Sequence, residues 1–288
     1  GKTLLASCVP SILPAIDDSE ALEVTCIQSI TGTVSPAGLA RKRPFRRPHH
    51  TVSPAGMLGG GNPPMPGEVT LAHRGVLYLD EFCEFRPQVI ESLRGPMEDG
   101  FIIVSRSSGR VSFPSRFMLI ASANPCPCGY LGDPERACVC QGASLMRYRR
   151  RLAGPVIDRI DIQIEVPRVR RIDLERPVAF LTSDSVRHEI EQARARQGER
   201  FRRKGFTNSA MGPRHIESIA RLAPAARRLL LDAVDQMALS ARAYHKLIRV
   251  SRTIADLDGA ESVEEGHVLE ALQYRVLDSE PQAVLSYG

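Results

Sequence analysis

Two hydrophobic patterns divide the chain. In the first part short apolar runs alternate with helical patterns, whereas almost everything after Ser183 has the spacing of amphipathic helices. The alternation predicts an α/β domain with a mostly parallel sheet, and the second pattern predicts an all-helical domain. We expect the α/β module over residues 1–168, a linker over 169–184 and the helical domain over 185–288.

The apolar runs of the first domain predict its strands and helices. Strands are expected at 23–28 (EVTCIQ), 75–82 (GVLYLDEF) and 116–124 (RFMLIASAN). Helices are expected from Leu4 to Leu13 and over 86–100, where Val89, Leu93 and Met97 recur every four positions.

Three segments interrupt this pattern. Residues 41–67 are basic and then rich in glycine and proline, which predicts an inserted loop or hairpin. Residues 100–115 contain two short β-patterns around Ser-Ser-Gly, which predicts a hairpin with Arg106 and Arg110 near its tip. The third segment, 125–141, holds four cysteines and is expected to be a loop.

Amphipathic spacing predicts long helices in the second domain. They are expected at 184–204, 223–237, 240–259 and 262–278. Ser240 and Ser262 stand in the capping positions of the last two.

Composition and charge narrow the class of protein. A hydrophobic content of 43% and a charged content of 25% are typical of a soluble globular chain. No apolar run reaches the roughly 18 residues that a membrane span needs, so we expect no membrane association. The net charge of +5 is concentrated at 41–47, 147–151 and 200–204, which fits either solvated faces or a polyanionic partner. Seven cysteines, an odd number, indicate reduced thiols and a cytoplasmic location.

The first three residues resemble half of a phosphate-binding loop. Gly1, Lys2 and Thr3 match the end of G-x-x-x-x-G-K-[ST] and open a helix. The other half does not precede them and residue 1 is not Met, so we expect the chain to be a fragment. In such loops the lysine contacts the β- and γ-phosphates and the hydroxyl binds Mg²⁺. Three residues alone are weak support for an ATP site.

An acidic pair strengthens this interpretation. Asp80 and Glu81 end an apolar strand, where a nucleotide hydrolase places an Asp that holds Mg²⁺ and a Glu that activates water. Asn124 ends the next strand pattern, and ligands gather at the carboxyl ends of parallel strands. Asn124 is therefore expected near the γ-phosphate or the attacking water, although a single Asn there is often only a turn residue.

The order of motifs resembles that of one family. GKT, GVLYLDEF, EDGFIIVSR, ASANPCPCGY, GPVIDRIDI, MGPRHI, LSARAYHKLIRVSRTIADL and EALQYR together look like the magnesium-chelatase-like AAA+ ATPases of the ComM/YifB type. The resemblance implies an AAA+ P-loop module followed by a helical lid, an ATPase activity with ATP and Mg²⁺, and a homo-oligomeric ring, expected to be a hexamer.

The resemblance also implies roles for two arginines. Arg159 matches the arginine finger that reaches the ATP of a neighbouring subunit, and its alternative is an ordinary surface arginine paired with Asp158 or Asp161. Arg242 matches a lid arginine that touches the γ-phosphate, and its alternative is one more lid arginine.

Relatives that act on nucleic acid point similar hairpins into a central pore. Arg106 and Arg110 of the hairpin are therefore candidate contacts to a DNA backbone, together with Arg41, Lys42 and Arg43 of the basic insert.

The cysteine-rich loop predicts a possible structural zinc site. Its four thiols are Cys126, Cys128, Cys138 and Cys140, in two C-x-C pairs. Four thiolates on a short loop can close a tetrahedral Zn²⁺ site, although C-x₂-C is the commoner spacing. The alternative is a set of reduced cysteines or a redox-labile pair.

Three functions remain open from the sequence. The first is a DNA helicase or branch-migration ATPase in recombination or natural transformation, which the basic clusters favour. The second is the ATPase subunit of a magnesium-chelatase-type metal-insertion complex, and the third is a non-catalytic AAA+ scaffold. The intact Asp80, Glu81, Asn124, Arg159 and Arg242 speak against the scaffold.

Overall fold

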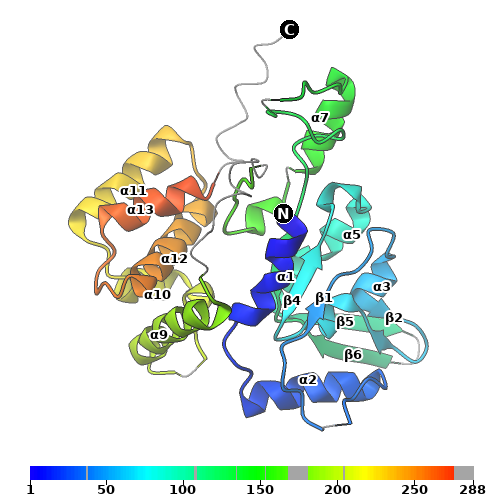
Figure 1. Ribbon diagram of the computed structural model, residues 1–288. Helices are drawn as coiled ribbons and strands as arrows, with labels where there is room; N and C mark the ends of the chain where they lie inside the picture. The colour runs from blue at the N-terminus through cyan, green and yellow to red at the C-terminus, as the bar shows by residue number, and fades with distance from the viewer. Residues whose placement is uncertain are drawn as a thin grey trace. The chain divides into compact units, whose positions relative to one another are not determined.

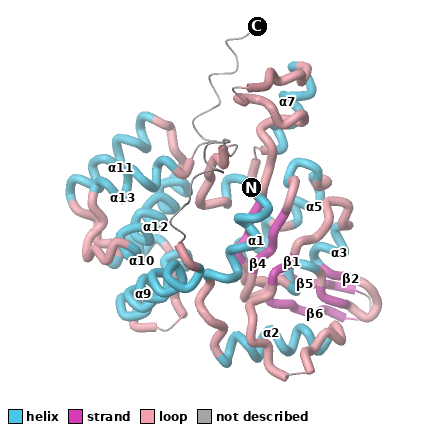
Figure 2. Tube along the Cα trace, viewed as in Figure 1, coloured by secondary structure: helices cyan, strands magenta, loops and turns pink. Residues whose placement is uncertain are grey.

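The chain divides into two structural units. A computed structural model describes residues 1–36, 38–106, 109–133, 135–152, 154–167, 181–203 and 205–275. The first unit comprises Gly1–Pro10 and Ala15–Arg159, and the second comprises Ser11–Pro14 and Ile160–Gly288. Figure 1 labels their elements, and Figure 2 shows strands in the first unit and helices in both. Most of the segment predicted to be a linker, 169–184, lies outside the described residues.

A parallel sheet is the centre of the first unit. Its strands are β1 (Phe45–Arg46), β4 (Val76–Leu79) and β7 (Met118–Ala121), in the order β1-β4-β7. Both neighbouring pairs are parallel, and β4 is buried along its whole length. The predicted α/β fold class with a parallel sheet is therefore confirmed, and the carboxyl ends of all three strands meet at one edge.

Short helices precede, separate and follow these strands along the chain. They are α1 (Lys2–Ile12), α2 (Asp18–Ile30), α3 (Pro54–Leu58), α4 (Glu68–Leu71), α5 (Pro87–Ser92), α6 (Arg94–Asp99) and α7 (Gly142–Arg151), with 3₁₀ turns η1 (Phe82–Glu84) and η2 (Ile157–Arg159). The predicted first helix is confirmed by α1. The helix predicted over 86–100 is divided at Leu93 into α5 and α6, and Val89 and Leu93 are buried.

The strand predicted at 23–28 is wrong, because these residues lie inside helix α2. The β-branched residues of EVTCIQ suggested a strand, but Asp17 begins a helix with a capping box. The Asp17 carboxylate accepts a hydrogen bond from the Glu20 backbone N–H at 2.9 Å. Val24 and Ile27 are then spaced to share a helical face and are buried, so packing outweighs the strand propensity.

The two inserts contain antiparallel hairpins. Within 41–67, strands β2 (Gly59–Gly60) and β3 (Met65–Pro66) pair after α3. Strands β5 (Phe101–Arg106) and β6 (Gly109–Pro114) pair in the segment for which the sequence predicts a hairpin. Residues 107 and 108, which separate the two strands in the sequence, lie outside the described part.

The second unit is built from helices in its described part, as expected. They are α9 (Ser183–Phe201), α10 (Pro213–Ile219), α11 (Pro224–Gln236), α12 (Ala241–Leu257) and α13 (Glu265–Gln273), with the 3₁₀ turn η3 (Asn208–Ala210). Ser240 caps α12, since its hydroxyl accepts from the Ala243 N–H at 3.2 Å. The cap predicted at Ser262 is wrong, because α13 begins only after Glu264.

A buried carboxylate holds three elements of the second unit together. Asp256 on α12 is fully buried and accepts hydrogen bonds from Arg200 on α9, from Arg252 at 3.2 Å and from the Asn208 side chain at 2.7 Å. Among the helices that the structure describes, none is both long and hydrophobic enough to cross a bilayer.

Gly75 allows strand β1 to lie against β4. A Cβ at this position would lie 1.9 Å from the carbonyl oxygen of Pro44, a backbone atom that cannot rotate away. The same carbonyl accepts a hydrogen bond from the Val76 N–H at 2.8 Å, which begins the β1–β4 pairing. Any side chain at 75 therefore forces the two strands apart.

We predict that Gly75→Ala destabilises the first unit by about 1–3 kcal/mol, since it overpacks a site with no free volume. Differential scanning calorimetry measures the loss. Gly95→Ala is the matched control, because a Cβ added at this position of helix α6 would meet no atom within 4 Å. This change should be neutral or stabilise by up to about 1 kcal/mol. Equal effects of the two substitutions would contradict the close approach.

Candidate functional site

The carboxylate of Asp80 is the centre of the site at the carboxyl edge of the sheet. Its Oδ1 accepts a hydrogen bond from the Ser122 hydroxyl at 2.6 Å and from the Tyr78 hydroxyl at 2.7 Å. Its Oδ2 accepts from the Thr3 hydroxyl at 3.2 Å and from the guanidinium of Arg47. Asp80 directly follows β4, Ser122 follows β7 and Arg47 follows β1. The parallel order of the strands therefore brings these groups together.

Asp80 is held in its ionised form. Burial is the largest single influence and raises its pKa, but the hydrogen bonds from Ser122 and Tyr78 and the charge of Arg47 outweigh it. The net result is a pKa below the usual 3.8. Burial raises the pKa of the neighbouring Tyr78 phenol, so Tyr78 stays a donor.

Lys2 lies at the same edge. Its ammonium donates to the Ala123 carbonyl and to the Asn124 side-chain oxygen, each at 2.7 Å. Lys2 and Thr3 are the first two residues of α1, and Gly1 precedes them, exposed. The structure thus places Lys2 against Asn124 and Thr3 against Asp80, which are four of the residues that the sequence predicts for a nucleotide site.

Glu81 follows Asp80 with a sharp change of backbone direction. It has φ 55° and ψ 49°, the left-handed region that non-glycine residues rarely adopt. The turn is fixed on its far side by the Phe82 N–H, which donates to the Ser122 carbonyl at 2.8 Å. Glu81 is exposed, so its carboxylate is accessible to solvent beside the Asp80 cluster. Local strain of this kind is common at functional sites.

The polar groups at this site are of the types that bind magnesium and nucleotide phosphates. Hydroxyl and carboxylate oxygens, here those of Thr3 and Asp80, are the ligand type that Mg²⁺ takes. An ammonium at the start of a helix, here that of Lys2, suits phosphate oxygens.

Sequence reasoning missed three residues of this site. Tyr78 and Ser122 are polar residues in apolar strand patterns, and that mismatch was the available signal. Arg47 carried no local signal, because it belongs to a dense basic cluster and its acidic partner is 33 positions away.

The two arginines assigned through the family resemblance belong to different units. Arg159 is only 8% exposed and forms an ion pair with Glu98 of α6 and a hydrogen bond with the Pro155 carbonyl. A finger role requires that it leave this pair. Arg242 belongs to the second unit, where it is exposed in the first turn of α12.

The predicted nucleic-acid contacts differ in their exposure. Arg43 is half-buried, donates to Glu20 at 2.7 Å and donates to the Arg74 carbonyl at 2.9 Å. Arg41 and Lys42 are exposed, and Arg41 makes a long ion pair with Asp18 at 3.8 Å. Arg110 is exposed on β6, and the side chain of Arg106 lies outside the described residues.

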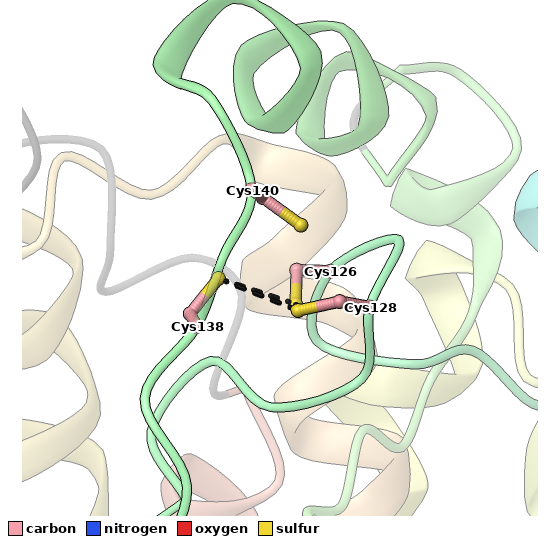
Figure 3. A group of neighbouring side chains, drawn as sticks. All are labelled: Cys126, Cys128, Cys138 and Cys140. Atoms are coloured by element: carbon pink, nitrogen blue, oxygen red, sulfur yellow. Dashed lines mark hydrogen bonds between the residues drawn. The ribbon is translucent and has the colours of Figure 1, made fainter.

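The four cysteines of the predicted zinc loop converge (Figure 3). Their sulfur atoms all lie within 4.8 Å of one another. The Cys126–Cys128, Cys126–Cys138 and Cys128–Cys138 sulfurs are 3.3, 3.7 and 3.6 Å apart. Tetrahedral Zn–S bonds of about 2.3 Å place sulfur atoms about 3.8 Å apart, so the cluster has the size of a zinc site.

The thiols of this cluster differ in acidity. Backbone N–H groups of Tyr130 and Val139 hydrogen-bond to Cys128 and lower its pKa to about 6. A backbone hydrogen bond from Cys128 lowers the pKa of Cys140, but burial and the neighbouring sulfurs outweigh it and raise the pKa to about 12. The first thiolate therefore makes further ionisation unfavourable, which is the electrostatic problem that a bound dication solves.

Comparison with known families gives two matches that cover most of the chain. Residues 1–174 match the model described as magnesium chelatase, subunit ChlI, and residues 181–275 match that of its C-terminal part. The competence protein ComM of Haemophilus influenzae is 40% identical over 279 residues, which is 96% of this chain and 54% of ComM. The uncharacterized protein YifB of Escherichia coli is 38% identical over 280 residues, again 96% and 54%. This chain therefore spans about half the length of these relatives.

A more distant similarity links the chain to a replication protein. The DNA replication licensing factor Mcm6 of Anopheles gambiae is 23% identical over 229 residues, which is 74% of this chain and 25% of Mcm6.

We predict that ionised Asp80 stabilises the first unit in a pH-dependent way. Its folded-state pKa lies below 3.8, so its contribution is fully present above about pH 5 and is lost as the pH falls through the folded-state pKa. The difference in free energy of unfolding between the wild type and Asp80→Asn should therefore be constant near neutrality and shrink on acidification. Urea unfolding across about pH 2.5–7 measures it. A difference that grows in acid would show that Asp80 is not held ionised.

Proposed function

Because this chain belongs to the ComM/YifB type of the magnesium-chelatase family of AAA+ proteins, we propose that it is an ATP-hydrolysing motor that acts on DNA. The observation that carries the ATPase part is the convergence of Lys2, Thr3, Asp80 and Asn124 at one sheet edge, with Glu81 exposed next to it.

Each of these residues has a role in the proposed site. Thr3 and Asp80 would hold Mg²⁺, which when bound neutralises phosphate charge and orients the phosphates. Lys2 would bind phosphate oxygens, for which it would leave its present acceptors at 123 and 124. Glu81 would take the proton of the attacking water, and Asn124 would position that water or the γ-phosphate.

The DNA part of the proposal is supported by exposed basic residues and by the relatives. Arg110 on the β5–β6 hairpin and Arg41 and Lys42 in the insert are exposed cations of the kind that contact a DNA backbone. We propose helicase or branch-migration activity in recombination or natural transformation, in keeping with the name of the Haemophilus relative, a competence protein. The similarity to a DNA replication licensing factor also favours a function on DNA.

We further propose that the protein acts as a homo-oligomeric ring, a hexamer in the cytoplasm. A ring would use Arg159 as a finger toward a neighbouring subunit once Arg159 is released from Glu98, and Arg242 as a lid contact to the γ-phosphate. For this mechanism we propose a module over 1–168, a linker over 169–184 and a lid over 185–288.

The central test is ATP hydrolysis by the chain preceded by a glycine-rich segment that completes a phosphate-binding loop. We expect turnover that single-stranded or branched DNA stimulates. Glu81→Gln should lower turnover by about 10²–10⁴-fold, because it removes the general base without changing the size of the side chain. A phosphate-release assay with and without DNA measures both effects.

The DNA contact is tested by Arg110→Ala, which should weaken the stimulation by DNA but leave the DNA-independent rate unchanged. Arg94→Ala is the matched control, since Arg94 is an exposed arginine on α6, outside the hairpin. Turnover that is indifferent to every DNA would refute the motor and favour the chelatase-type ATPase subunit. A protein that binds ATP without hydrolysing it would favour the scaffold.

We also propose that the four-cysteine loop binds a structural Zn²⁺. The sulfur separations support it, and Cys126 is fully buried only two residues beyond Asn124. A metal there would join the segment that follows β7 to the segment that enters α7, through Cys140. Its proposed role is to brace the loop that carries Asn124.

The chain purified under reducing conditions should therefore contain about one zinc ion, measured by mass spectrometry of the metal, with thermal stability that falls on chelation. The double substitution Cys138→Ser/Cys140→Ser should lose the zinc. Cys26→Ser is the control, because Cys26 is exposed on α2 and outside the cluster. Retention of zinc by the double variant would refute the site.

A further inference from the structure

Arg47 occupies the oxygen of Asp80 that a metal ion would use. The Oδ1 atom is taken by the Ser122 and Tyr78 hydroxyls, at 2.6 and 2.7 Å. The Oδ2 atom faces Thr3 at 3.2 Å and is the one that Arg47 binds. If Thr3 and Asp80 together hold Mg²⁺, the Asp80 atom that binds the metal would be Oδ2, because Oδ2 is the oxygen that faces Thr3. The guanidinium of Arg47 and the metal would therefore compete for the same atom.

The geometry holds Arg47 at this position by more than charge. Its guanidinium carbon lies 5.5 Å from the centre of the Tyr78 ring, a cation–π distance, and the same Tyr78 donates its hydroxyl to Asp80. The preceding residue, Arg46, forms two hydrogen bonds with Glu68 at 2.7 and 2.8 Å. This bidentate ion pair fixes the end of strand β1, and the side chain of the next residue, Arg47, is directed toward Asp80.

The Arg47–Asp80 ion pair can also exchange its partners. The Arg47 side chain is 48% exposed, whereas that of Asp80 is 20% exposed. Release of Arg47 therefore leaves a cation that water can solvate, while Asp80 requires a replacement cation because of its partial burial. A guanidinium is moreover a planar donor that matches phosphate oxygens in two hydrogen bonds.

We propose that Arg47 is a positioning residue that competes with a divalent cation for Asp80 and makes cation binding at this site depend on nucleotide. Nucleotide phosphates supply the anion that accepts the released guanidinium, so that metal and nucleotide bind together. This inference rests on the proposed ATPase site, but its test needs no turnover.

The test is Mn²⁺ binding to the protein without nucleotide, followed by electron paramagnetic resonance. Arg47→Ala should bind Mn²⁺ about three- to tenfold more tightly than the wild type, which is the size expected for removal of a partly exposed competing ion pair. Asp80→Asn should abolish the gain in the Arg47→Ala background. With a non-hydrolysable ATP analogue present, the wild type and Arg47→Ala should differ less.

Arg41→Ala is the matched control. It removes the same charge from the same basic segment, but Arg41 is exposed and lies 3.8 Å from Asp18, outside the site. Arg47→Gln, which keeps a hydrogen-bond donor without the charge, is the second variant if Arg47→Ala unfolds. Mn²⁺ affinity in Arg47→Ala that equals that of Arg41→Ala, or is weaker than wild type, overturns the competition. If the wild type does not hydrolyse ATP but Arg47→Ala binds Mn²⁺ more tightly than the wild type, only the ATPase proposal is refuted.

Discussion

The hydrogen-bonding capacity of one carboxylate organises the first unit. Asp80 has two oxygens, and the structure gives each of them two donors, which come from the helix start at Thr3 and from all three strands of the sheet. This is possible only because the strands are parallel and end at the same edge. Gly75 is part of the same constraint, since its missing side chain lets β1 approach β4 closely enough for Arg47 to reach the acid.

The sequence predicted those parts of the site that follow from local order along the chain. Lys2, Thr3, Asp80 and Asn124 each begin or follow a regular element, and parallel strands bring such positions together. Arg47 could not be found in this way, because its importance depends on which strands are neighbours and on the sheet order β1-β4-β7. Ser122 was signalled only by its polarity in an apolar strand pattern. The sheet order is a property of tertiary packing, and no spacing in one sequence encodes it directly.

The error at 23–28 has a similar origin. β-Branched residues favour strands when a pleated, half-buried surface is available, but here the capping residue Asp17 starts a helix and the core accepts Val24 and Ile27 from one helical face. The same distinction applies to charge. In the basic segment 41–47, Arg43, Arg46 and Arg47 each meet a carboxylate from another part of the chain. Charge density along the sequence therefore overstates the positive surface open to a partner.

Arg47 and Arg159 are each paired with a carboxylate, but the exposures of the two pairs are reversed. Arg47 is more exposed than its partner Asp80, whereas Arg159 is less exposed than its partner Glu98. The side chain of Glu98, the partner of Arg159, is 37% exposed although that of Arg159 is only 6% exposed. If Arg159 left, Glu98 would be solvated at small cost, whereas the guanidinium would need a new anion. A phosphate is the anion that suits it, because the planar donors of arginine match two phosphate oxygens. The ion pair is therefore compatible with a finger role only in exchange for a charged ligand. Glu98 lies on α6, and the chain continues from α6 into the β5–β6 hairpin.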